Sequence, residues 1–277
     1  MINFPLKKTS ISLYVFQVFK CLVYILLTAN IFFFYQEESL AVKSTFSQGI
    51  SISDIIQGFA ATLDTAAWVM LLFLFELNTS EYLKRLNSLN NAFIAKNFIR
   101  IFSYGLICYA FFGYLLKYIL LINIEPFFIE DVCSLVDQGY YLIENLDEYP
   151  LMTASNCLAL SNNPLFVLSG QAILGTKSDW QAIQNLGLVD IINSGTWILI
   201  VMIIELEVLF GSKLLTTRLK FLNLKILKTI LYLILFSAAA FWGFKGDFLD
   251  FWDAFLWLVA FFFIELNLLK IGQPQTN

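Results

Sequence analysis

Long apolar runs recur along this chain and leave it few ways to fold. Each has about 20 residues or more, the length that a helix needs to cross about 30 Å of hydrocarbon. Inside lipid every backbone polar group must be satisfied within the segment, so each run predicts a transmembrane helix. The runs lie at 11–36, 52–77, 98–123, 187–210, 221–244 and 250–271. We therefore expect an all-α membrane protein with about six transmembrane helices.

Composition supports this assignment and excludes several kinds of site. Hydrophobic residues make up 59% of the chain and charged residues 14%, against about 45–50% and 25% in soluble domains. Histidine is absent, which removes His-based metal sites and Ser-His-Asp catalysis. The chain also lacks a basic face for nucleic acid. We expect no enzyme activity, no metal and no cofactor, and the lipid bilayer as the main surrounding.

Basic residues are distributed unevenly between the two sides of the predicted spans. Four of the 17 Lys and Arg residues lie on one side, at Lys43, Lys117, Lys177 and Lys245. The others lie on the side of the N terminus, at Lys7, Lys8, Lys20, Lys84, Arg85, Lys96, Arg100, Lys213, Arg218, Lys220, Lys225, Lys228 and Lys270. Because cytoplasmic loops carry the excess of positive charge, we expect both termini in the cytoplasm of a cell inner or plasma membrane.

The segment 125–180 then lies outside the cytoplasm and is too apolar for a free linker. We expect a small folded cap there, with an amphipathic helix over 131–146, where apolar residues recur at helical spacing. Cys133 and Cys157 lie in this segment. In an oxidising compartment they form a candidate disulfide, and two free thiols are the alternative.

A pattern repeats three times along the chain. Trp68, Trp197 and Trp257 are each followed eight residues later by Glu-Leu, at Glu76, Glu205 and Glu265. Four residues before each Trp stands Asp64, Asn193 or Asp253, and the other helices carry a basic residue four before a Tyr, at Lys20, Arg100 and Lys228. The pattern predicts three two-helix hairpins of one orientation, over 11–77, 98–210 and 221–271, with the cap inserted in the middle hairpin.

The repeated residues allow two interpretations. Each basic residue begins a hairpin and each Glu ends it, so Lys20, Arg100 and Lys228 can pair with Glu76, Glu205 and Glu265 as structural ion pairs. Alternatively, the three glutamates form an acidic ring like those of cation channels. Asp64, Asn193 and Asp253 would add a second level to a cation path, or else serve as interhelical hydrogen-bond groups. The tryptophans are interpreted as packing anchors.

Two functions follow from these alternatives. The first is a small cation or proton channel or transporter that uses the repeated carboxylates within the membrane. The second is a non-catalytic structural or assembly subunit of a larger membrane complex, with membrane-protein partners or further copies of this chain.

Overall fold

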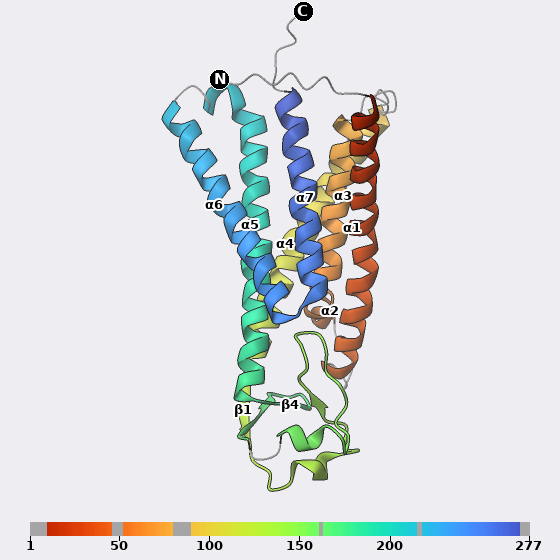
Figure 1. The fold of residues 1–277 in the computed structure, drawn as a ribbon, viewed down its shortest axis with the longest axis vertical. Helices are drawn as coiled ribbons and strands as arrows, with labels where there is room; N and C mark the ends of the chain where they lie inside the picture. Colours follow the sequence, from red (N-terminus) through yellow and green to blue (C-terminus); the bar gives the residue numbers. More distant parts are fainter. Residues whose placement is uncertain (1–9, 46–51, 80–89, 161–162, 215–217, 272–277) are drawn as a thin grey trace, which may run out of the picture.

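The computed structural model describes residues 10–45, 52–79, 90–160, 163–214 and 218–271 of the chain. Most of these residues are helical (Figure 1). The helices are α1 (Ser10–Thr45), α2 (Ile52–Gly58), α3 (Ala60–Thr79), α4 (Asn90–Ile122), α5 (Lys177–Leu214), α6 (Arg218–Lys245) and α7 (Phe248–Ile271). The predicted helical class is confirmed in this respect.

The long helices form a closed ring in chain order. Each packs on its neighbour, α1 on α3, α3 on α4, α4 on α5, α5 on α6 and α6 on α7, and α7 packs back on α1. We call the end where α1 begins and α7 ends the terminal end. The opposite end carries the chain between α4 and α5, and we call it the cap end (Figure 1).

Five helices in the described part of the chain are long and apolar enough to cross a membrane. These are Tyr14–Thr45, Ala60–Leu77, Ile94–Ile122, Lys177–Leu206 and Leu224–Lys245. Large apolar side chains point outward from them, among them Ile25, Ile101 and Leu233, which are all at least 60% exposed. Since a water-soluble surface does not carry such a continuous apolar cover, this outer face suits lipid.

Several helix boundaries differ from the sequence prediction. Helix α1 continues to Thr45, and α5 begins at Lys177 instead of 187. The start of α5 is fixed by a helix-capping interaction at Thr176. The backbone N–H and the hydroxyl of Thr176 both donate to Asp179 Oδ2, at 2.8 and 2.7 Å. The first turns of α5 bury Trp180 and Ile183 against the cap. The added turns therefore connect the membrane helices to the cap.

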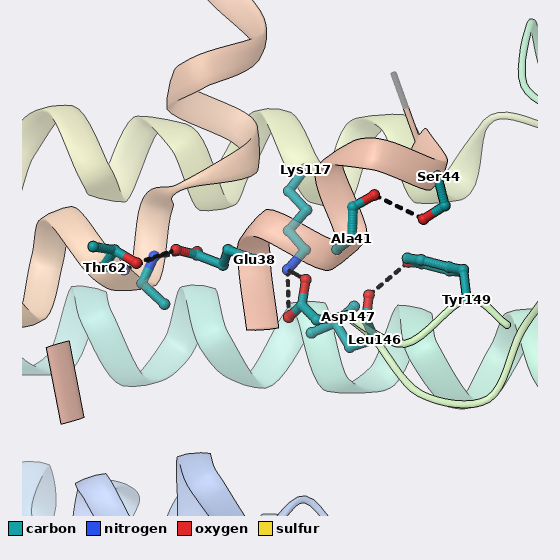
Figure 2. Close-up of polar contacts among 9 residues, drawn as sticks. Glu38, Ala41, Ser44, Thr62, Lys117, Leu146, Asp147 and Tyr149 are labelled. Atoms are coloured by element: carbon teal, nitrogen blue, oxygen red, sulfur yellow. Dashed lines mark hydrogen bonds and ion pairs between the residues drawn. The ribbon is translucent and has the colours of Figure 1, made fainter. Parts of the chain in front are cut away.

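The predicted second span is broken at Phe59 into α2 and α3. The carboxylate of Glu38, on α1, fills the break. It accepts the backbone N–H groups of Ala61 and Thr62 at 2.8 and 3.0 Å, and the Thr62 hydroxyl at 2.6 Å (Figure 2). These N–H groups are among those that a helix start leaves without a helical partner, and the start of a helix favours negative charge. A buried acid on α1 thus completes the beginning of α3.

The cap holds a four-stranded sheet in the order β1-β3-β4-β2. Its strands are β1 (Ile124–Phe127), β2 (Tyr141–Leu142), β3 (Leu165–Leu168) and β4 (Ile173–Thr176). Strand β3 pairs antiparallel with β1 and β4, and β2 pairs parallel with β4. Cys133 and Cys157 are joined by a disulfide, with their Cα atoms 5.2 Å apart.

The helix expected over 131–146 is wrong. Only Val132–Leu135 is helical there, as the short 3-10 helix η2, and Tyr141–Leu142 is a strand. Asp137 and Gly139 both have positive φ, at 66° and 79°. A right-handed helix cannot continue through such residues, so the apolar spacing of this segment serves packing around a turn.

A candidate functional site: an acidic cavity inside the helix ring

A polar cavity of about 50 Å³ lies inside the ring, towards the cap end. Side chains of α1, α3, α4, α5, α6 and α7 line it, together with Asp147 from the cap. By the usual measure a site of about 10–15 Å³ holds one water. The cavity therefore has room for a few water molecules or a small hydrated ion.

Carboxyl groups dominate the wall of this cavity. Seven acidic residues line it and one lysine, Lys117, does. The acids are Glu37, Glu38, Asp64, Asp147, Asp190, Asp250 and Asp253. They lie along the wall, and within the described residues no three acids are arranged to hold a metal ion. Ionisable groups at membrane depth are costly unless they pair or face water, so this excess of acids marks the cavity as a candidate site.

Three of the acids have partners in the protein. Glu38 is bonded to the start of α3, as described above. Asp147 accepts the Lys117 ammonium on both oxygens, at 2.6 and 2.9 Å, and so ties the cap to α4 (Figure 2). Asp253 on α7 accepts the Asn30 side-chain amide of α1 at 2.7 Å. These contacts fix the walls of the cavity across helices that are distant in sequence.

Other oxygens on the cavity wall lack a partner. Oδ1 of Asp64, of Asp190 and of Asn193 are each buried without a hydrogen bond from the described protein groups. Buried polar atoms in proteins are almost always satisfied, by protein or by ordered water. These acceptors are therefore positioned to receive bonds from water, from a proton carrier or from a cation inside the cavity.

An aromatic layer closes the cavity on its terminal side. The ring of Trp68 lies 6.4 Å from Trp197 and 6.3 Å from Trp257, and Phe261 lies 4.5 Å from Trp197. Each tryptophan stands one turn beyond Asp64, Asn193 or Asp253 on its helix, in the direction of the terminal end. The structure thus brings together, around one cavity, six residues that the repeat singled out.

The glutamates of the repeat lie elsewhere. Each stands twelve residues beyond the Asp or Asn of its helix, which is roughly 18 Å along the axis at 1.5 Å per residue. Glu76 pairs with Lys20 at 2.5 Å and accepts the Tyr24 hydroxyl at 3.4 Å. Neither Glu76 nor Glu205 lines the cavity.

The structure shows a different contact at the second expected ion pair and does not describe the third. Glu205 accepts the Tyr104 hydroxyl at 2.6 Å, while Arg100 is exposed. The side chain of Glu265, and with it the expected pair with Lys228, lies outside the described residues. The aromatic layer separates the level of Glu76 and Glu205 from the cavity.

Two buried titratable groups near the cap, Asp247 and Tyr149, lie outside the apolar spans. Burial raises the pKa of the Asp247 carboxyl above its usual range, and the negative charge of Asp147 raises it further. Burial likewise raises the pKa of the Tyr149 hydroxyl, which donates to the carbonyl of Leu146 at 2.5 Å.

Several cavity residues were missed by the sequence analysis. Glu37, Glu38, Lys117 and Asp147 carry no repeated motif and became visible only through the fold. Asp190 and Asp250 could have been predicted from the repeat, because each stands three residues before a repeated residue, Asn193 or Asp253.

No protein-family model, no curated protein and no solved structure matches this chain.

Proposed function

We propose that this protein binds cations or protons in the acidic cavity and carries them across a membrane, as a small channel or transporter. The observation that carries the proposal is the ratio of seven acids to one lysine on the cavity wall. So many carboxyl groups cannot all stay ionised next to one another without positive charge, because desolvation and like-charge repulsion are both unfavourable. Bound cations or protons supply that charge.

The proposed architecture is three hairpin repeats of one orientation around the cavity, with α7 as a sixth span. Equivalent positions of the three hairpins support it, because they line the same cavity wall. The first set is Asp64, Asn193 and Asp253, and the second is Trp68, Trp197 and Trp257. A third set stands ten residues after the tyrosine of each first helix, at Phe34, Tyr114 and Trp242.

The proposed orientation places the terminal end in the cytoplasm, because most Lys and Arg residues belong to that side. The cap and the cavity then face the outside, and the disulfide of the cap suits an oxidising compartment. The aromatic layer lies on the cytoplasmic side of the cavity. Transport therefore requires the Trp68, Trp197 and Phe261 rings to move apart, so this conformation is closed towards the cytoplasm.

The test is flux through the purified protein in liposomes that contain a fluorescent indicator for the ion applied, sensitive to pH, Na⁺ or K⁺. Proton, Na⁺ and K⁺ gradients are applied one at a time. We expect flux of at least one of them, and a reduction of about tenfold or more in the Asp64→Asn and Asp253→Asn double variant, because both retain size but lose charge. Glu130→Gln is the control, since Glu130 is an exposed acid of the cap. Flux that is unchanged in the double variant would refute the role of the cavity.

The repeated glutamates need their own variant. Replacement of Glu76, Glu205 and Glu265 together by Gln tests the acidic ring that these residues are proposed to form at the terminal end. We expect flux to fall in this triple variant if ions pass that level, and to stay at the wild-type value if the three residues are structural only.

A role as a subunit of a membrane complex is favoured by one separate observation. Phe128 and Leu158 in the cap are 92% and 68% exposed, and exposed apolar side chains in a folded cap suit contact with a partner. Native mass spectrometry of protein extracted with its own lipids tests this alternative. A stoichiometric partner would support the subunit role, and a lone chain or homo-oligomer would support independent transport.

A further inference from the structure

A groove of about 850 Å³ lies beside the cavity, between α1, the cap segment Tyr141–Pro150 and the first turns of α7. Glu37 and Asp147 line both the groove and the cavity. The two spaces therefore meet at these carboxylates. The groove is far larger than the cavity and lies in the size range of sites for small organic ligands.

The groove combines negative charge with aromatic surface. Glu37, Glu144, Asp147 and Glu148 line it, and Lys43 is the one basic residue among its described lining. Phe33, Phe248 and Trp252 line it as well. The Phe248 and Trp252 rings are stacked, with centroids 6.3 Å apart. Aromatic faces next to carboxylates are the surroundings in which proteins bind organic ammonium groups.

We propose that this groove binds an organic cation with an apolar body, and that its ammonium group lies at Glu37 and Asp147. The inference rests on the proposed function and deepens it, because it names the class of cation that the cavity attracts. Charge complementarity supports this occupant over an anion or a neutral ligand. The unpartnered Oδ1 of Asp190, a residue 8% exposed in the adjoining cavity, adds to the attraction for positive charge.

The relative sizes of the two spaces decide how far the ligand enters. A cavity of about 50 Å³ cannot hold an aromatic or alkyl body, whereas the groove can. The body therefore stays on Phe248 and Trp252, and the ammonium reaches the junction. Lys117 already occupies both oxygens of Asp147 there. The bound ammonium thus competes with the lysine of the protein for the same carboxylate.

Benzyltrimethylammonium and neopentylbenzene form a matched pair of probes, since they have the same shape and differ in charge. Binding of each to the wild-type protein in phosphatidylcholine nanodiscs is measured by calorimetry. We expect the cation to bind about tenfold or more tightly than the neutral compound, because of cation–π and carboxylate attraction. Equal binding of the two compounds would overturn the proposal, and this comparison needs no variant.

Variants locate the site. Glu37→Gln and Trp252→Leu are each expected to weaken binding of benzyltrimethylammonium by about fivefold or more, and Glu130→Gln on the cap is expected to leave it within twofold. Equal affinity in all three variants would place the ligand elsewhere and overturn the assignment.

The same protein preparation separates this inference from the proposed function. Liposome flux of inorganic cations or protons without any binding of benzyltrimethylammonium would refute the groove ligand and leave the cavity role standing. Binding without flux of any ion would refute transport and leave the groove site standing.

Discussion

The carboxylate of Glu38 is expected to stabilise the broken helix start more than any other single polar group in the bundle. It is 3% exposed and accepts three hydrogen bonds, from the N–H groups of Ala61 and Thr62 and from the Thr62 hydroxyl. Hydrogen bonds to a charged group contribute about 1.5–3 kcal/mol each. The Glu38→Ala variant loses all three and leaves two N–H groups unpaired, so even the lower value predicts a loss of about 4.5 kcal/mol.

The Glu38→Gln variant refines this expectation. Its amide keeps one acceptor oxygen, but its NH₂ group faces N–H donors and cannot bond to them. We expect a loss of about 2 kcal/mol, between wild type and Glu38→Ala. Gln36→Ala, an exposed position of the same helix, is the control and is expected to change stability by less than about 0.5 kcal/mol.

The free energy of unfolding is measured by titration of mixed dodecylmaltoside micelles with sodium dodecyl sulfate, followed by tryptophan fluorescence. A Glu38→Gln variant that is as stable as wild type, or more stable, would refute the reasoning. It would mean that repulsion between Glu38 and the other acids of the cavity outweighs the hydrogen bonds at the start of α3.

Three further outcomes follow from the structure. Gly113→Ala is expected to lower the free energy of unfolding by about 1–3 kcal/mol in the same titration, because its new Cβ would lie 2.4 Å from the Ile56 carbonyl oxygen. Gly105→Ala is the control: its Cβ would have no atom within 4 Å, so it should be neutral or stabilising. Replacing both Cys133 and Cys157 with Ser removes a crosslink over 24 residues and should destabilise the cap by about 3 kcal/mol, seen as faster amide exchange in 132–160 while α6 is unchanged. Because folding raises the pKa of Asp247, its protonated carboxyl adds to the free energy of unfolding at pH values below the usual aspartate pKa. This contribution is lost as the pH rises through the raised pKa. Asp247 directly precedes α7, and its carboxyl accepts a backbone hydrogen bond from Asp250. Asp247→Asn keeps an acceptor at this helix start but removes the titrating group. It should therefore reduce the fall of the unfolding temperature with rising pH, and an unchanged pH profile would contradict this.

The sequence predicted the elements that depend on length and periodicity. A run of about 20 apolar residues is stable in lipid as a helix, because its backbone hydrogen bonds then lie within the segment. The helices could therefore be predicted from the sequence. The repeated Asp64, Asp253 and tryptophans were also recognised there, and the structure places them around one cavity. The positive φ of Asp137 could not be predicted from the sequence, because the apolar residues around it have the spacing of a helix. The helix break at Phe59 could not be predicted either, because Glu38, which bonds to the start of α3, belongs to α1.

The candidate site was predictable only in part, because most of its charge comes from contacts between distant segments. Lys117 and Asp147 are 30 residues apart and belong to a helix and to the cap. Nothing in their local sequence indicates that they meet. By contrast, Asp190 and Asp250 repeat at a fixed distance from Asn193 and Asp253, so a wider comparison of the three hairpins would have found them.

Helix α5 runs without interruption from the cap to the terminal end. Its 38 residues carry Trp180 under the cap sheet, Asn193 and Trp197 at the cavity and Glu205 beyond the aromatic layer. It contains no proline, and its Ser194–Gly195 pair, just before Trp197, is of the kind at which helices bend. One continuous helix therefore connects the cap sheet with the aromatic layer at Trp197, so a tilt of the cap is expected to displace that layer.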